Sequence, residues 1–425
     1  MFSAQPEYVL FLAYLLLGPL AWLAYGLIIY AGRRRMLLLK RPVEPLQATP
    51  PPKVSILIPA KDEGERIRSC IGSALAQDYP NFNVIAIDDR STDNTGAVMD
   101  DMAAKDANLK AFHNTVAPPP GWTGKNNALH QGVKHADGDW LLFVDSDVVL
   151  ERDALSASMG VVLRKKFDLI SLLPRLESHS TWEGLLVPLC GSVASSIYLI
   201  ALTNNNLDFW RNTAFANGQF LMISRAAYDA IGGHETVRDR YCEDVEIARL
   251  LKTRGLRPRV SWGNDFCSVR MYSSLESIFK GWGRIFYAGR NGSPWRVLAA
   301  AAAVVFCCFS AYAALAWGLV RLASPATLSL GYYWGQWTVS AAAAWLTASL
   351  GHLALFMYVL GVMYRWTGNR RRNALLFPVA GSMLLAIFFK ALKMCVTKKV
   401  EWRGTNYSHV MADHLGTPAH QPKAG

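Results

Sequence analysis

The longest apolar segments of the chain lie towards its two ends. Residues 8–31 contain no charged side chain, and residues 297–320 and 336–364 are nearly as apolar. Residues 374–392 are apolar apart from Lys390. About 20 apolar residues are enough to cross a bilayer as a helix. The pattern therefore predicts membrane helices at both ends of the chain and a more polar domain between them.

The first apolar segment differs from a signal peptide in two respects. Its apolar stretch is longer than the h-region of a signal peptide, and no basic residues precede it. We therefore expect residues 8–31 to be a permanent membrane anchor.

Residues 53–175 alternate between short apolar runs and amphipathic segments. Short apolar strands separated by helices predict a parallel sheet that helices cover on both faces. The fold class expected is therefore α/β. The expected strands are at 54–59, 83–88, 109–112, 140–145 and 168–173, and the expected helices are near 65–76, 93–105, 124–136 and 152–165.

The second half of the polar domain begins with another apolar stretch. Residues 182–203 contain Pro188 and Gly191, which favours an amphipathic helix at the membrane surface over a crossing. A strand and two helices should then complete the domain, near 219–223, 225–231 and 244–254. We expect a membrane helix with a basic linker at residues 1–52 and the α/β domain at residues 53–290. C-terminal membrane segments should follow at residues 291–396, and a cytosolic tail at residues 397–425.

The net charge of +12 is concentrated beside the apolar segments, in Arg33–Arg35, Lys40–Arg41, Arg370–Arg372 and Lys398–Lys399. Lys and Arg beside membrane helices favour the cytoplasmic side. We therefore expect a multi-pass protein of the cell membrane whose polar domain is cytoplasmic. These charges indicate anionic lipid headgroups as partners and do not indicate nucleic acid. Seven cysteines without a CxxC spacing argue against disulfides or a structural zinc site.

Four acidic clusters follow one another along the polar domain: Asp62-Glu63, Asp88-Asp89, Asp145-Ser146-Asp147 and Glu243-Asp244. The first three come where an apolar run stops. In a parallel sheet this is the carboxyl edge, where ligands bind. Carboxylates gathered there repel one another unless a cation lies between them, which suggests a divalent metal carrying a phosphorylated ligand.

The pair Asp145 and Asp147 is the strongest metal candidate. In an extended strand the i, i+2 spacing points both carboxylates to one side, where one Mg²⁺ or Mn²⁺ can bind both. The pair Asp88-Asp89 precedes a helix start at which Ser91 or Asp93 is expected to be the N-cap. Capping does not need the paired carboxylates at 88 and 89, which are candidates for the ribose or base of a nucleotide.

Three further motifs contain candidate ligand-binding or catalytic residues. Lys125 follows glycines at a helix start, which suits a phosphate or sugar, although the spacing is not that of a Walker A motif. Asp244 is either a favourable charge at a helix N-terminus or a general base for an acceptor hydroxyl. Trp282 and Arg284 are either a topology signal beside the membrane or a site for a leaving diphosphate. His130, His135 and His234 form no metal-binding pattern and are expected to be ordinary surface residues.

Taken together, these motifs resemble the family 2 glycosyltransferases, which have a GT-A fold, a Rossmann-like mixed sheet, and inverting chemistry. The similarity extends over residues 53–290. It implies that Asp145 and Asp147 bind the metal, that Asp244 is the catalytic base, and that 280–284 matches the (Q/R)xxRW motif loosely, with Lys280 first and the Trp before the Arg. The other nucleotide-sugar contacts that it implies are Asp62, Glu63, Asp88, Asp89, Lys125, Asp145, Trp282 and Arg284.

The flanking membrane segments, Gly121–Lys125 and the run 400–407 are similar to the ceramide glucosyltransferase-like and hopanoid- or carotenoid-associated branch. This implies metal-dependent transfer of a hexose from a nucleotide sugar, expected to be UDP-linked, to the hydroxyl of a membrane lipid. The alternatives are a processive polysaccharide synthase and a non-catalytic membrane scaffold. Pro378 and Gly381 can bend a helix, so we expect 374–392 to be a re-entrant or interfacial hairpin, with the C-terminus cytoplasmic and 402–407 near the catalytic domain.

Overall fold

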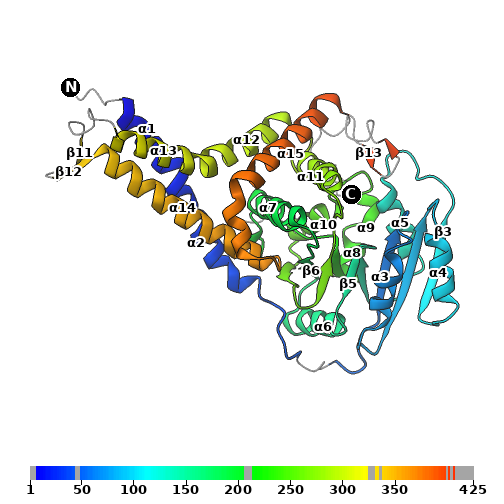
Figure 1. The fold of residues 1–425 in the computed structure, drawn as a ribbon. Helices are drawn as coiled ribbons and strands as arrows, with labels where there is room; N and C mark the ends of the chain where they lie inside the picture. The colour runs from blue at the N-terminus through cyan, green and yellow to red at the C-terminus, as the bar shows by residue number, and fades with distance from the viewer. Residues whose placement is uncertain are drawn as a thin grey trace, which may run out of the picture.

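The computed structural model describes most of the chain. The described residues are 6–43, 48–204, 213–323, 331–334, 337–398, 401–402 and 405–406. A domain built on a β-sheet lies on one side, and a group of long helices extends away from it (Figure 1).

A seven-stranded mixed sheet forms the centre of the α/β domain, in the order β3-β2-β1-β4-β8-β6-β9. The strands from β3 to β4 are parallel, as expected for residues 53–175, and β8 runs antiparallel to both of its neighbours, so the expected mixed sheet is confirmed. A second sheet has the order β5-β10-β7. The strands are β1 Val54–Ala60, β2 Phe82–Asp89, β3 Leu109–Asn114, β4 Trp140–Val144, β5 Val148–Leu150, β6 Leu169–Leu173, β7 Arg175–Leu176, β8 Phe220–Ser224, β9 Pro258–Trp262 and β10 Cys267–Val269.

Helices cover both faces of the main sheet, because successive strand residues point to opposite faces. Ile56 and Ile58 pack towards α3, α4 and α6, whereas Leu57 packs towards α5, α8 and α10. The sheet is therefore buried on both sides, and only its strand ends can present polar groups. The helices of this domain are α3 Ile67–Leu75, α4 Thr95–Ala103, α5 Gly124–Val133, α6 Ala154–Lys165, α8 Arg225–Ala230, α9 Gly233–Thr236 and α10 Glu243–Thr253.

The N-cap of α4 is Asn94, not Ser91 or Asp93 as expected, and its side chain makes no capping hydrogen bond. Asp93 instead accepts from the amide of Thr95 at 2.9 Å, inside the loop. Ser91 also lies in this loop, where its hydroxyl accepts from the Asp62 amide at 3.0 Å. Both predicted capping residues therefore stabilise the loop between β2 and α4 and do not cap the helix.

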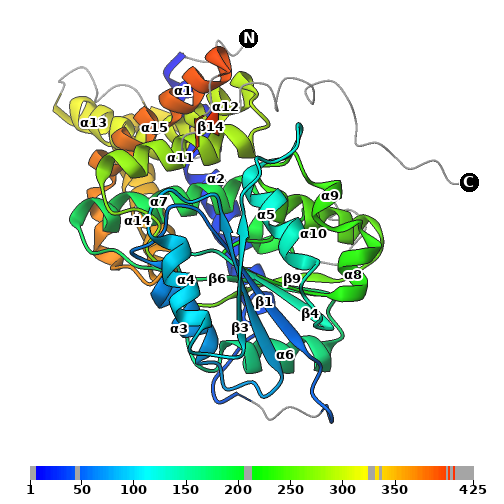
Figure 2. The same cartoon turned by 90° about the vertical axis from the view of Figure 1, so that its right-hand side faces the viewer.

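Two helices lie between the sheet domain and the long apolar helices, α7 Thr181–Ile197 and α11 Leu275–Gly289 (Figure 2). The N-terminus of α7 is capped by Ser180, whose hydroxyl accepts from the amide of Glu183. Glu183 is 1% exposed and pairs with Arg270 through two contacts of 3.0 and 3.1 Å. This buried pair attaches α7 to the segment that follows β10. The predicted helix at 182–203 is thus present, and it ends at Ile197 before a short 3₁₀ turn.

Four helical segments of the described chain are long and apolar enough to cross a membrane: Pro6–Arg35, Pro294–Ala323, Ala341–Trp366 and Arg371–Thr397. They contain α1 Pro6–Leu15, α2 Ala21–Gly32, α12 Pro294–Val304, α13 Ser310–Ala323, α14 Ala341–Trp366 and α15 Phe377–Thr397. The third predicted segment begins later than expected, because residues 331–334 and 337–340 form a hairpin of β11 and β12.

Polar contacts join the far ends of these helices. Glu7 on α1 accepts from the indole nitrogens of Trp317 on α13 and Trp345 on α14, at 3.3 and 3.2 Å, and lies 3.0 Å from Arg321. A carboxylate among apolar helices is costly unless it is paired in this way. The cluster therefore fixes α1 against α13 and α14.

Helix α15 takes a different course. It packs on α7, α11 and α12, beside the sheet domain, whereas α13 and α14 pack on each other and extend away from it (Figure 1). Pro378 lies in its first turn, where proline is tolerated. Helix α15 is therefore continuous from Phe377 to Thr397, and the expectation of a hairpin at 374–392 is wrong. Within the segment 402–407, the structure describes residues 402, 405 and 406. The prediction that this segment lies near the catalytic domain therefore falls partly outside the described residues and stays a prediction.

Candidate active site

A cavity of about 860 Å³ opens at the carboxyl ends of β1, β2 and β4. It continues from these strand ends to α11 and α15, so that one space connects the sheet domain with the apolar helices. Acidic and basic side chains lie together at the strand ends, whereas the charged side chains that α11 and α15 contribute to the wall are all basic. The charged residues of its wall are Lys61, Asp89, Arg90, Lys125, Asp145, Asp147, Glu243, Lys280, Arg284 and Lys390.

Asp145 and Asp147 both line this cavity, but not as expected from an extended strand. Strand β4 ends at Val144, and the two aspartates lie in the turn before β5, closed by a hydrogen bond from the Val148 amide to the Asp145 carbonyl. Burial, then the carboxylates of Asp145 and Glu63, raise the pKa of Asp147 to about 7. Crowded acidic groups of this kind accommodate a cation. Asp145 and Asp147 can supply two oxygen ligands, and within the described residues no third His, Cys, Asp or Glu completes a metal-binding group.

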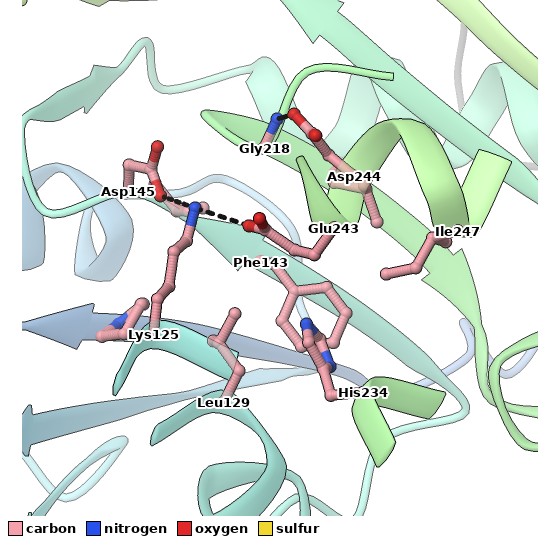
Figure 3. Close-up of a pocket in the computed structure, with 12 residues that line it drawn as sticks. Lys125, Leu129, Phe143, Asp145, Gly218, His234, Glu243, Asp244 and Ile247 are labelled. Carbon is pink, nitrogen blue, oxygen red and sulfur yellow. Dashed lines mark hydrogen bonds and ion pairs between the residues drawn. The ribbon is translucent and has the colours of Figure 1, made fainter. Parts of the chain in front are cut away.

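Lys125 lies between two of the acidic clusters (Figure 3). Its ammonium nitrogen is 2.7 Å from Asp145 and 2.9 Å from Glu243. Burial alone would lower the pKa of Lys125, but the two carboxylates outweigh it and hold the pKa well above its usual range. Lys125 was predicted to contact a phosphate or sugar. In this structure it connects the metal-binding turn to the start of α10.

The position of Lys125 depends on a residue that the sequence patterns do not reveal. Asn126 is fully buried, and its amide donates to the carbonyl oxygens of Val237 and Arg240, at 2.8 and 2.9 Å. These bonds attach the first turn of α5 to the loop that leads into α10. An asparagine in a helical first turn carries no signal of such a distant partner, so only the fold reveals its role.

Asp244 is held rigidly at the start of α10. Its carboxylate accepts from the amides of Gly218 and Val245, at 2.7 and 2.8 Å. Burial and the adjacent Glu243 raise the pKa of Asp244 to about 7, while Lys125 opposes this shift. Glu243 lines the large cavity, whereas Asp244 lines a narrow inner pocket beside it that Lys125, Glu243 and Asp145 also line (Figure 3).

His234 borders the inner pocket and is 1% exposed, so the expectation of a surface histidine is wrong for this residue. Its Nδ1 lies 2.8 Å from the Tyr228 hydroxyl. Burial, then the charge of Lys125, lower its pKa to about 3. His234 is therefore a neutral wall residue of the pocket.

Of the acidic residues predicted at the nucleoside end, only Asp89 lines the large cavity, with Arg90 beside it at 2.8 Å. Asp88 instead accepts from the Ser91 amide and contacts His113 at 3.1 Å. It therefore shapes the loop after β2.

Asp62 and Glu63 do not line the cavity. Asp62 accepts from the Thr92 amide at 2.7 Å, and the Glu63 amide donates to Thr95 at 2.8 Å. These contacts join the loop after β1 to the loop after β2. Glu63 also lies within electrostatic reach of Asp147.

Trp282 and Arg284, the two predicted nucleotide-sugar contacts on α11, have different surroundings. Arg284 lines the cavity. Trp282 is 4% exposed, is absent from the cavity wall, and packs beside Phe286 in the apolar cluster shared by α7, α11 and α15. The structure therefore places Trp282 among packing residues and away from the predicted nucleotide-sugar contact.

Comparisons with known proteins agree with this geometry. Residues 55–232 match the family described as glycosyl transferase family 2. The chain is 27% identical over 363 residues to a 4,4'-diaponeurosporenoate glycosyltransferase of Staphylococcus aureus (strain MRSA252), covering 84% of this chain and 88% of the relative. The protein of strain bovine RF122 / ET3-1 is 26% identical over the same length.

Among solved structures, the mannosyltransferase PcManGT from Pyrobaculum calidifontis, in complex with GDP-Man and Mn²⁺, is 18% identical with a TM-score of 0.44. That match covers 79% of this chain and 96% of the other. A Mycobacterium tuberculosis glucosyl-3-phosphoglycerate synthase in complex with Mn²⁺ and UDP-Glc is 17% identical with a TM-score of 0.36, covering 56% and 77% of the two chains. The mixed α/β sheet thus contains a region, residues 55–232, that matches glycosyl transferase family 2, and the chain is a glycosyltransferase.

Proposed function

We propose that this glycosyltransferase moves a hexose from a UDP-linked donor to the hydroxyl of a membrane lipid, with inversion at the anomeric carbon. One observation carries the proposal: the carboxylates at the strand ends and the helices beside the membrane segments line the same cavity. A volume of about 860 Å³ is within the usual range for small-molecule sites. A nucleotide sugar bound at the strand ends would have its sugar directed towards the apolar helices.

The donor would lie along the cavity wall from Asp89 to Asp145. Asp89 is the only predicted nucleoside contact on that wall, and its carboxylate suits the hydroxyls of a ribose or the N–H of a base. Asp145 and Asp147 would hold Mg²⁺ or Mn²⁺, with the remaining ligands from the donor phosphates and water. A divalent ion supplies positive charge for the diphosphate as it departs.

Asp244 would act as the general base. It accepts the proton of the acceptor hydroxyl while that oxygen forms a bond to the anomeric carbon, and the bond from this carbon to the UDP oxygen breaks. The electron pair leaves with UDP. A single displacement inverts the anomeric centre and needs no carboxylate nucleophile. The two amides that hold Asp244 fix its orientation for this step.

Glu243 is the alternative base, because it lines the large cavity directly. Its carboxylate is already paired with Lys125 at 2.9 Å. Asp244 instead accepts from two backbone amides, and its pKa is raised to about 7, a value that suits a general base. This comparison favours Asp244.

The acceptor would enter from the membrane side. Met271, Ile285 and Met394 give that end of the cavity an apolar wall, and the Staphylococcus aureus relatives are named as 4,4'-diaponeurosporenoate glycosyltransferases. Basic residues at 33–35 and 370–372 support a cytoplasmic catalytic domain in a multi-pass protein of the cell membrane. The packing of α15 on α7, α11 and α12 supports an interfacial course for this helix.

The test is transfer of radiolabelled hexose from UDP-hexose to lipids by the purified protein in nanodiscs, with mass spectrometry of the product. One sugar per lipid supports the proposal, and long glycan chains would indicate a polysaccharide synthase. A scaffold would transfer no sugar and would bind UDP equally with Mn²⁺ or EDTA. The anomeric configuration of the product, measured by NMR, tests inversion.

A further inference from the structure

Three basic residues meet where the cavity approaches the membrane helices. Lys280 and Arg284 come from α11, and Lys390 comes from α15, more than a hundred residues later in the chain. The stem of Lys390 crosses α11 at Gly283, where a Cβ atom would lie 3.6 Å from its Cγ. The lysine stem therefore packs on α11, and Lys390 lines the same cavity wall as the other two cations.

The three cations of this wall differ in their partners. Lys280 pairs with Glu276 at 2.5 Å. Within the part of the chain that the structure describes, none of the ion pairs includes Lys390. Like charges on a partly dehydrated wall repel one another, and a bound anion would remove this cost. An ionisable residue in an otherwise apolar helix is also a strong indication of a functional site.

Snorkelling towards the headgroups is the ordinary explanation for a lysine near the end of a membrane helix. Lys393, one turn further on, fits that explanation because it is exposed and absent from the cavity wall. Lys390 differs, since its side chain is half-buried and lines the cavity. The two lysines of α15 therefore have different surroundings.

We propose that Lys390 binds the diphosphate of the donor, so that helix α15 completes the donor site of the catalytic domain. This inference rests on the proposed function. Lys390, Arg284, Asp145 and Asp147 all line the same cavity. A diphosphate carries charge on both phosphates, and the metal-binding turn and Lys390 would approach it from different sides. As the bond to the sugar breaks, Lys390 would stabilise the negative charge gained by UDP.

The experiment measures UDP binding to the full-length protein in nanodiscs with Mn²⁺, by isothermal titration calorimetry, with uridine as a competitor that lacks phosphates. The variants are Lys390→Met, Lys390→Gln and Lys390→Arg, with Lys393→Met as the matched control. Removing a charged hydrogen-bond donor should weaken UDP binding by about ten- to a hundredfold in the Met and Gln variants. Uridine binding should not change, Lys390→Arg should retain most of the affinity, and Lys393→Met should resemble the wild type. Melting temperatures in detergent identify a variant that has lost its fold, and the Gln variant then replaces the Met variant.

Equal UDP affinity in Lys390→Met and wild type would overturn the inference while leaving the proposed function in place. A raised KM for the lipid acceptor with unchanged UDP binding would also overturn it, and would assign Lys390 to the acceptor. A parallel loss of uridine and UDP binding would show a structural effect and count against it. Failure of the wild-type protein to bind UDP with Mn²⁺ would instead overturn the proposed function, and the inference with it.

Discussion

The ammonium group of Lys125 lies 2.9 Å from the carboxylate of Glu243, although the two residues belong to helices more than a hundred residues apart. Lys125 also lies 2.7 Å from Asp145. A single cation, whose side chain is 20% exposed, therefore joins the turn that would hold the metal to the helix that would carry the base. Changes at either acidic pair should consequently affect the other.

Substituting Lys125 by Met should move the pH dependence of transfer. The positive charge of Lys125 lowers the pKa of Asp244, against burial and Glu243, which raise it. Without that charge the pKa of Asp244 rises, so the increase in turnover with pH should shift to higher pH. The measurement is turnover at saturating donor from pH 6 to 9. An unchanged pH profile with reduced turnover would contradict this coupling.

Substituting Asp147 by Ala should abolish transfer and the dependence of UDP binding on Mn²⁺. One of only two carboxylate ligands would be lost, and Mg²⁺ or Mn²⁺ would keep too few protein ligands. Titrations of UDP with Mn²⁺ and with EDTA test this. Asp101→Ala is the control, because Asp101 lies on an exposed face and pairs with Arg68 and Lys105, away from the cavity. Normal turnover of Asp147→Ala would exclude the metal mechanism.

Substituting Asp244 by Asn should lower turnover at least about a hundredfold, the usual scale for a general base. The affinity for UDP should change little, because the base contacts the acceptor. Glu243→Gln should retain more activity than Asp244→Asn if Asp244 is the base. The reverse order in a steady-state assay would transfer the role to Glu243.

Wild-type turnover should rise with pH through about 7. The raised pKa of Asp244 leaves its carboxyl protonated below about pH 7, where it cannot accept the hydroxyl proton. Above that pH it is ionised and active. A profile of turnover against pH checks the sign, and a rate that falls as pH rises from 6 to 7.5 would be incompatible with a base at this position.

Breaking the pair of Glu183 and Arg270 should destabilise the protein. Glu183 is 1% exposed, and loss of one partner from a buried pair costs about 3–5 kcal/mol. We expect the lower end, about 3 kcal/mol, because the Arg270 side chain is 36% exposed. Thermal unfolding in detergent of Glu183→Gln, Arg270→Gln and the double variant measures this coupling. Additive effects of the two single changes would contradict it.

The pair of Glu183 and Arg270 should also make the stability of the protein depend on pH in the acid range. Burial alone would raise the pKa of Glu183, but hydrogen bonds from Arg270, the His179 amide and Ser180 lower it to about 2. A lowered carboxyl pKa contributes stability at pH above the ordinary glutamate value, and this contribution disappears as pH falls through about 2. Wild type should therefore lose more of its stability than Glu183→Gln between pH 5 and pH 2.

Much of the architecture follows from local patterns in the chain. The apolar segments and the strands of the sheet domain were predicted from short-range hydropathy, because about 20 apolar residues span a bilayer and a buried strand needs an apolar run. The three carboxylate clusters that end apolar runs were recognised for the same reason. Asp145 and Asp147 do line the cavity, although a turn and not an extended strand places them there.

The details of the site depend on contacts between segments far apart in the chain. Asp89 lines the cavity while Asp88, its neighbour, supports a loop, because successive residues at the end of β2 point to opposite faces of the sheet. The antiparallel β8 follows from the packing of the second half of the domain against β4, which no local pattern specifies. Lys390 lines the cavity because α15 packs on α11, a helix about a hundred residues earlier in the chain. Hydropathy along the chain indicates which side chains are buried. The partner of a buried charge depends on which distant elements pack together, and the tertiary structure alone decides this.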